Sequence, residues 1–344
     1  MYRGNMSFPF EIKTVEEELG KRILKLFPCD DKPCIEVGPK KYVVPDKYRL
    51  IGPKVYNFKI RPDDTWIVTH PRSGTTWHQE LIYIINSDLD FENAKQPLTD
   101  RFPQIEFGSV ISDFAIEQAR QDLIKEGKES QINLLYHLTQ DQVPVLDKVE
   151  GKRYIKTHVP ISLLPPKLLD TCKVIYVCRN PKDIAVSFFL LCSQLRNFQY
   201  NGDFPTFLDY FENNHLRFGP YWEHLREAWE LRDHPNMLFH QYEDSIRDVK
   251  TAIRKFSAHL GKNLTDEQVQ QVADHIHIDN FKKNKSVNFD DKMFAMTKGK
   301  GEFVRKGKSG NWKDHFTPEL NARADKWIAE NIARIPGFAF AKYE

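Results

Sequence analysis

The residues with the clearest chemical meaning lie in the stretch HPRSGTT, residues 70–76. Arg72 supplies a positive charge, and Gly74 permits a tight backbone. The other polar residues of this stretch supply hydroxyl groups: Ser73, Thr75 and Thr76. Such groups bind phosphate or sulfate when they lie at the N-terminus of a helix, so we predict an anion cradle here. The alternative is an ordinary strand-to-helix turn whose hydroxyls only cap the helix.

This stretch is not the phosphate-binding loop of nucleotide triphosphatases. That loop needs a second glycine five residues before Gly74 and a lysine directly after it. Thr69 and Thr75 occupy these two positions. The sequence therefore disfavours a nucleotide triphosphatase.

A lysine and a histidine follow a second apolar segment, in RYIKTHVP, residues 153–160. This segment predicts a short strand that places Lys156 and His158 at its carboxyl end, where open α/β sheets bind their ligands. A neutral imidazole accepts a proton near pH 7, so we consider His158 a candidate general base. A lone histidine is otherwise usually structural.

A third polar group lies in YVCRNPKDIAVS, where Arg179 ends a strand and Ser187 lies on the helix that follows. A guanidinium and a hydroxyl that flank a helix start can share one phosphate. We therefore predict a second anion site at Arg179 and Ser187. The alternative is a plain ion pair between Arg179 and Asp183.

Residues 282–313 are rich in lysine and glycine. The glycines allow the backbone to approach a ligand closely. We consider a phosphate clamp centred on Arg305, Lys306 and Gly307, with a solvated basic loop as the alternative.

The elements that must position these groups are strands of a parallel sheet. Residues 65–69, 174–177 and 237–240 are apolar or β-branched runs without alternation, which is typical of strands covered on both faces. Helices are predicted from Trp77 and from Pro181. Polar residues follow each strand, so we expect the candidate groups to gather at one edge of the sheet.

Composition excludes several classes of protein. The chain has 344 residues, 40% of them hydrophobic, which is enough for a buried core. The formal net charge is only +2, so no global field favours nucleic acid or an anionic membrane. No apolar run is long enough to span a bilayer, and no signal-peptide pattern is present. We expect a soluble protein of the cytoplasm.

The cysteines and histidines give no sign of a metal site. The five cysteines lack paired spacing, and the pair His275 and His277 has no further ligand beside it. We expect free thiols and no bound metal.

We expect one domain over residues 1–344 with three notable segments. Residues 1–60 form an N-terminal segment laid across the domain, residues 89–150 form an insertion that shapes the acceptor pocket, and residues 282–313 form the basic cofactor-clamp loop.

The motifs THPRSGTTW, YIKTHVP, YVCRNPKDIAVS, YED and FVRKGKSGNW occur in the order found in the cytosolic sulfotransferases. The chain resembles this family over nearly its whole length. The long segment before His158 and the arginine at position 72 are more similar to the insect members, including retinol dehydratase. The resemblance implies a doubly wound α/β fold, with a mainly parallel central sheet flanked by helices.

The resemblance also implies an activity and a donor, 3′-phosphoadenosine 5′-phosphosulfate (PAPS), which becomes adenosine 3′,5′-bisphosphate (PAP). By position, the 5′-phosphosulfate would be held by Arg72, Ser73, Gly74, Thr75 and Thr76. The 3′-phosphate would be held by Arg179, Ser187, Arg305, Lys306 and Gly307. Further cofactor contacts would come from Trp77, Tyr242, Ile276, Ile278 and Phe303. His158 matches the catalytic base, and Lys156 the residue that steadies the transferring group.

Three features depart from the family pattern. Ile276, His277 and Ile278 stand where many relatives have Thr, Ser and Phe near the adenine, which reduces aromatic stacking. Arginine at position 72 is not equivalent to the usual lysine. The usual dimer motif is degraded, with Ala322 where an acid belongs, so a homodimer remains open.

We predict transfer of a sulfuryl group to a hydroxyl by in-line displacement, with charge neutralised by Arg72 and Lys156 and no metal. The acceptor would be small and lipophilic: a phenol, steroid, retinoid or other alcohol. Its pocket would be lined by Phe107, Phe114, Leu191, Phe289 and Phe294. The alternatives are sulfation followed by elimination, a nucleotide kinase, and a nucleotide-binding protein without catalysis.

Overall fold

A four-stranded parallel sheet forms the centre of the part of the chain described by the computed structural model, which comprises residues 7–195, 198–288 and 309–341. The strands are β4 Thr65–Thr69, β5 Tyr154–Thr157, β6 Lys173–Cys178 and β7 Met237–Gln241. Their order is β5-β4-β6-β7, and every neighbouring pair is parallel. The order changes direction between β4 and β6, which is where such sheets open a crevice for ligands.

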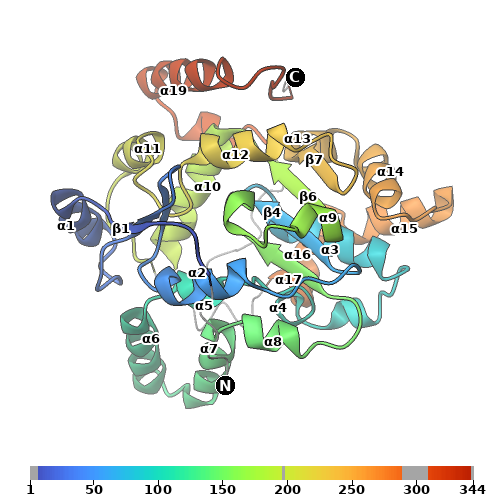
Figure 1. Ribbon diagram of the computed structural model, residues 1–344, viewed down its shortest axis with the longest axis horizontal. Helices are drawn as coiled ribbons and strands as arrows, with labels where there is room; N and C mark the ends of the chain where they lie inside the picture. The colour runs from blue at the N-terminus through green and yellow to red at the C-terminus, as the bar shows by residue number, and fades with distance from the viewer. Residues whose placement is uncertain (1–6, 196–197, 289–308, 342–344) are drawn as a thin grey trace.

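Helices cover both faces of this sheet (Figure 1). On β6, Ile175 packs into a core with Leu81 of α3 (Thr75–Asn86) and Phe256 of α14 (Val249–His259). Tyr176 of the same strand faces the other core, with Leu225 of α12 (Tyr221–Glu230). The strands have no polar face, so their apolar runs do not alternate. The predicted doubly wound α/β fold is confirmed.

The other elements complete these layers. In chain order the helices are α1 Glu17–Leu26, α2 Tyr48–Tyr56, α4 Leu98–Arg101, α5 Phe107–Val110, α6 Asp113–Lys125, α7 Ile132–Thr139, α8 Val143–Asp147, α9 Leu168–Thr171, α10 Pro181–Gln194, α11 Phe204–Glu212, α13 Tyr242–Arg247, α15 Asp266–His275, α16 Ile278–Lys283, α17 Lys285–Asn288 and α19 Pro318–Ile332. Short 3-10 turns lie at η1 Asn93–Lys95, η2 Glu129–Gln131, η3 Ile161–Leu163 and η4 Asn311–Asp314.

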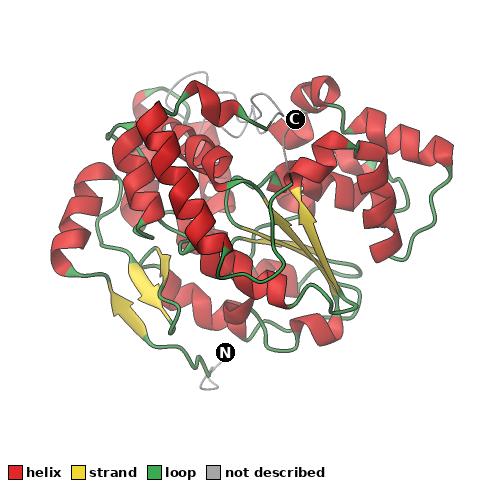
Figure 2. Ribbon diagram, turned by 90° about the horizontal axis from the view of Figure 1, so that it is seen from above, coloured by secondary structure: helices red, strands yellow, loops and turns green. Residues whose placement is uncertain are grey.

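The N-terminal segment contains a second, antiparallel sheet that the sequence did not predict. Its strands are β1 Ile12–Thr14, β2 Ile35–Val37 and β3 Tyr42–Val44. Figure 2 shows this small sheet apart from the central one. Val43 of β3 exchanges backbone hydrogen bonds with the 218–219 segment, donating to the carbonyl of Gly219 (2.8 Å) and accepting from the N–H of Phe218 (2.7 Å).

The segment before α5 extends the edge of the central sheet beyond β5. The N–H of Ile105 donates to the carbonyl of Lys156 (3.0 Å), and the N–H of Lys156 donates to the carbonyl of Pro103 (2.9 Å). A parallel bridge joins Gln104 and Lys156. These bonds place residues 103–106 beside the end of β5.

One buried ion pair holds the start of β4 against the start of β5. Arg153 contacts Asp64 through two hydrogen bonds, of 2.7 and 2.6 Å, and both side chains are fully buried. Asp64→Ala would leave the buried guanidinium with only the more distant carboxylate of Asp147, at 3.9 Å, and we expect it to lower the free energy of unfolding by about 3–5 kcal/mol. Urea unfolding measures this difference. Glu92→Ala, which breaks the exposed pair with Lys95, is the control and should change it by less than about 1 kcal/mol; equal effects would contradict the prediction.

Candidate active site

The stretch between β4 and α3 has the backbone shape of an anion cradle. Arg72 and Gly74 both have left-handed backbone angles, with φ of 72° and 85°. Gly74 is the N-cap of α3, and no side chain among the described residues caps this end of the helix. The N–H groups of the first turn have no partner within the helix, so they remain to bind an anion. The alternative in which the hydroxyls only cap the helix is not observed.

Tyr242 shapes the floor of the cradle. Its ring lies so close to Gly74 that a Cβ added there would be 2.3 Å from Tyr242 Cδ2. Glycine at position 74 therefore satisfies both the left-handed backbone and the close approach of the ring. Ser73 is fully buried, and its hydroxyl has no hydrogen-bond partner in the described ranges.

Thr69 links the cradle to His158. Its hydroxyl lies 2.8 Å from the hydroxyl of Thr75 and 3.1 Å from Nδ1 of His158. Its carbonyl lies 2.8 Å from the same Nδ1. Because a carbonyl can only accept, Nδ1 carries the proton and Nε2 of the neutral ring is the basic nitrogen. The last residue of β4 thus sets the tautomer of the candidate base.

The backbone of His158 is held on both sides. Its N–H donates to Oε1 of Glu106 (2.8 Å), and its carbonyl accepts from Nε2 of His224 (3.1 Å). Tyr176 completes this support, with its hydroxyl 2.8 Å from Nδ1 of His224. The His158 ring also packs edge-on against Phe218, at 5.6 Å between centroids. These contacts leave the imidazole one orientation.

Burial and charge set the protonation states at this edge of the sheet. Burial, together with the positive charge of Lys156, lowers the pKa of His158 well below its usual value, so the ring is neutral at pH 7. Burial lowers the pKa of Lys156 to about 8, and the negative charge of Glu106 opposes that shift. Burial also raises the pKa of Glu106.

The two predicted anion sites are joined by hydrogen bonds. Ser187 was expected to act with Arg179, but its hydroxyl accepts from Nε of Arg72 (2.9 Å). Nη1 of Arg179 donates to the carbonyl of Arg72 (3.1 Å), and the guanidinium lies 4.5 Å over the Tyr242 ring. The alternative ion pair with Asp183 is also present, at 3.9 Å. Arg72 therefore connects the first predicted anion site, at residues 70–76, with the second, at Arg179 and Ser187.

The remaining predicted cofactor residues divide into two sets. Trp77 donates from Nε1 to the carbonyl of buried Ile276 (3.0 Å), and Ile278 is partly buried at the start of α16. Phe303, Arg305, Lys306 and Gly307 lie outside the described residues. Asp183 holds the chain directly after them, since it accepts from the N–H of Gly310 (2.9 Å).

Comparison with known proteins settles the family. The family model described as "Sulfotransferase domain" matches residues 62–336, which is most of the chain. The chain belongs to the sulfotransferase family.

Its similarities to individual family members cover nearly the whole sequence. It is 32% identical to luciferin sulfotransferase of Photinus pyralis, over 94% of this chain and 87% of that protein. It is 33% identical to sulfotransferase 1E1 of Homo sapiens, over 80% of this chain and 85% of that protein. A crystal structure of retinol dehydratase in a complex with retinol and PAP superposes with a TM-score of 0.90, at 33% identity, over 97% of this chain and 99% of that chain. Among the described residues, no helix is long and apolar enough to cross a membrane.

The predicted acceptor residues of this sulfotransferase differ in their burial, and two of them are not described. Phe107 and Leu191 are partly buried, whereas Phe114 of α6 is 42% exposed. Phe289 and Phe294 lie outside the described residues. The acceptor side stays a prediction.

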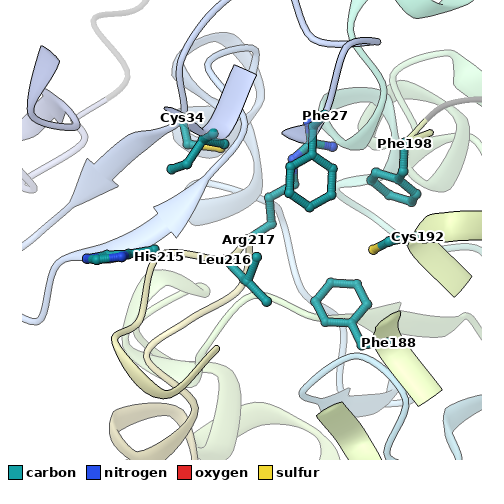
Figure 3. A pocket seen from close by; sticks show the side chains of 9 residues that line it. Phe27, Cys34, Phe188, Cys192, Phe198, His215, Leu216 and Arg217 are labelled. Atoms are coloured by element: carbon teal, nitrogen blue, oxygen red, sulfur yellow. The ribbon is translucent and has the colours of Figure 1, made fainter. Parts of the chain in front are cut away.

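The structure of this sulfotransferase also shows a pocket lined by residues of several distant segments (Figure 3). Phe188, which follows Ser187, lines this pocket. Its ring packs edge-on against the His70 ring, with 6.3 Å between the ring centroids. Arg217 also lines it, paired with Asp30 and lying over the Phe198 ring. The pocket is small, and its lining is Ile23, Phe27, Cys34, Phe188, Cys192, Phe198, His215, Leu216 and Arg217.

Two residues of the site were missed by sequence reasoning. Glu106 lies in the insertion, and its pairing with His158 depends on the edge bridge beside β5. His224 lies in the interior of α12. Neither shows a local motif; the signal that could have found Glu106 is an acid after a short β-like stretch, FPQIE.

All five cysteines are buried thiols that form no disulfide, as expected. The described residues contain no group of His, Cys, Asp and Glu that could hold a metal ion. His275, half of the H-x-H pair, instead lies 2.7 Å from Glu80.

Proposed function

We propose that this sulfotransferase moves the sulfuryl group of PAPS to a hydroxyl of a small lipophilic acceptor and releases PAP. The observation that carries the proposal is the sharing of Thr69 between the cradle and His158. This sharing supports the proposal because it links the His158 ring to Thr75, the first residue of α3. Solved structures of retinol dehydratase, similar over nearly the whole chain, contain PAP together with retinol or androsterone.

The residues present fit the donor. The left-handed Gly74 and its uncapped helix leave N–H groups for the 5′-phosphosulfate, beside Arg72. Arg179 would hold the 3′-phosphate, together with Arg305, Lys306 and Gly307 of the basic loop. Trp77 and Tyr242 would contact the adenine. When bound, the donor supplies an activated sulfuryl group with phosphate as its leaving group.

The residues of the chain then have distinct roles in the transfer. His158 would accept the proton of the acceptor hydroxyl at Nε2, because Nδ1 is occupied by Thr69. Lys156 and Arg72 would offset the negative charge that moves from the donor to its leaving oxygen. Glu106 would position His158 through its backbone N–H. Positioning and charge stabilisation would supply most of the acceleration.

The pKa of Lys156 gives a test of its role. If Lys156 must be charged to bind the donor, kcat/KM for PAPS should be constant below pH 8 and fall above it, since the ammonium is lost as pH rises through about 8. We expect no acid limb near pH 6.5, because the pKa of His158 lies well below that value. Initial rates between pH 6 and 10 measure both.

Lys156→Arg is the control for this limb. Arginine stays charged at every pH of the experiment, so the fall near pH 8 should disappear even if the overall rate is lower. If the fall in kcat/KM near pH 8 persists unchanged in this variant, a group other than Lys156 causes it.

A second candidate is sulfation of an allylic alcohol followed by elimination of sulfate from the resulting ester. The structural similarity to retinol dehydratase, at a TM-score of 0.90, favours it. Product analysis with retinol separates the two, because transfer alone leaves a sulfate ester whereas elimination leaves a dehydrated hydrocarbon.

The function itself is tested with PAPS labelled in its sulfur. The protein is incubated with phenols, steroids, retinoids and simple alcohols, and ATP with magnesium serves as the control donor. Label in an organic product supports the proposal. Transfer from ATP, or tight PAP binding without any transfer over the panel, would contradict it.

We also infer that residues 1–344 act as one sulfotransferase domain. The N-terminal sheet supports this, because it is hydrogen-bonded to the segment that carries Phe218. We do not infer the usual form of homodimer, because its motif is degraded in this chain. Thr317, which lies five residues before Ala322, caps α19 by accepting from the N–H of Leu320 (3.3 Å).

A further inference from the structure

A buried polar group is hydrogen-bonded to the carbonyl of Gly74 in the cradle. It consists of His78 on α3, Ser245 on α13 and His240 on β7, and all three are at most 3% exposed. The Ser245 hydroxyl lies between the two rings, 2.9 Å from Nε2 of His78 and 2.7 Å from Nε2 of His240. The transfer reaction proposed above uses none of these residues.

The hydrogen-bond direction in this group is fixed at one end. Nδ1 of His78 lies 3.0 Å from the carbonyl of Gly74, and a carbonyl can only accept, so Nδ1 carries the proton. Burial lowers the pKa of His78 to about 4 and that of His240 to about 2, so both rings are neutral and each carries one proton.

The remaining protons then follow in order. Nε2 of His78 is bare and must accept the Ser245 hydroxyl proton. That hydroxyl has no second proton, so it accepts from His240, which carries its proton on Nε2. Nδ1 of His240 is then bare, and it is buried without a hydrogen-bond partner in the described ranges. We call this one-directional arrangement, from His240 through Ser245 and His78 to the Gly74 carbonyl, the relay.

The relay ends on the peptide that the cradle depends on. In a planar trans peptide the C=O and N–H point in opposite directions, so fixing the Gly74 carbonyl also fixes the N–H of Thr75. The same carbonyl accepts the ordinary helical bond from the N–H of His78, at 3.2 Å. Gly74 adopts left-handed angles at little cost, and an unrestrained glycine peptide there could rotate.

We propose that the relay is a positioning device for the 5′ end of the nucleotide, with His78 holding the Thr75 N–H toward the anion. The proposal rests on the cradle binding a 5′-phosphate or 5′-phosphosulfate. It also couples the cradle to α13, since Tyr242, whose ring lies against Gly74, begins the helix that carries Ser245. On the 3′ side, the guanidinium of Arg179 lies over the Tyr242 ring.

Nucleotide binding by Ser245→Ala tests the proposal. By calorimetry, the affinity for PAP should fall about tenfold, because the relay loses its central donor and acceptor. Affinity for adenosine 3′-monophosphate, which lacks the 5′ group, should stay within about twofold. Ser245→Thr keeps the hydroxyl and should restore PAP binding. An equal loss for both nucleotides would indicate a general structural role and overturn the proposal.

Ser257→Ala is the matched control. Ser257 is also a buried serine, and its hydroxyl has no hydrogen-bond partner in the described ranges. Its replacement removes the same atom without touching the relay, so PAP binding should not change.

Nitrogen-15 NMR of the full-length protein tests the relay without any variant or nucleotide. His78 should show a protonated Nδ1 and a bare Nε2, and His240 the opposite pattern. Any other pattern overturns the relay. If the wild-type protein binds neither nucleotide, the proposed function fails, while the NMR pattern still decides whether the relay exists.

Discussion

His158→Ala is expected to lower kcat by about 100- to 10,000-fold, the range typical of a lost general base. Affinity for PAP should change little, because the hydrogen bonds that link the His158 ring to the cradle within the described ranges all go through Thr69. The alanine variant keeps the backbone N–H that donates to Glu106. Single-turnover rates with labelled PAPS measure the chemical step, and calorimetry with PAP measures binding.

A second histidine controls for general effects of the substitution. His137 lies on α7 with its side chain 53% exposed. His137→Ala should leave both kcat and PAP binding unchanged. Retained turnover in His158→Ala would remove His158 from the role of base, and a parallel loss of PAP binding would point to a disrupted cradle instead.

Gly74→Ala is expected to abolish measurable nucleotide binding, with a loss of at least about 100-fold in PAP affinity, equivalent to about 2.7 kcal/mol. The new Cβ would lie 2.3 Å from Tyr242 Cδ2. The left-handed φ of 85° adds about 1–2 kcal/mol of strain. Because the residue is the N-cap of α3, both costs fall on the peptides that face the anion.

Gly127→Ala separates the strain from the clash. Gly127 has a similar φ of 67°, but nothing lies within 4 Å of an added Cβ. This variant should lose about 1–2 kcal/mol of stability through strain alone and bind PAP normally. If Gly74→Ala binds PAP as Gly127→Ala does, the close approach of Tyr242 is not important for the cradle.

The sequence predicted the central sheet well because its strands are buried on both faces. Residues 174–177 were expected as a strand, and β6 spans Lys173–Cys178. Residues 237–240 were expected, and β7 spans Met237–Gln241. Unbroken apolar runs of this length are difficult to place elsewhere in a soluble fold. The polar residues after each strand then share one edge by geometry, which brings Arg72, His158 and Arg179 together.

The supporting contacts could not be predicted, since they join residues that no local pattern connects. Glu106 meets His158 across 52 positions. Ser187 was assigned to Arg179 from its position on the helix, yet it bonds to Arg72, 115 positions away. The strands of the N-terminal sheet are three residues each, too short for a readable period. Contacts of this kind depend on how the helices and strands pack together in the folded protein.

The hydrogen bonds between β3 and the 218–219 segment join residues inside the family match to a strand that lies before it. Homology defines the transferase unit as residues 62–336, and β3 lies before it. Yet Val43 pins Phe218, whose ring supports the imidazole of His158. A polypeptide trimmed to residues 62–336 would therefore keep Arg72, Lys156 and His158 but would lose the strand that holds Phe218 against the His158 ring.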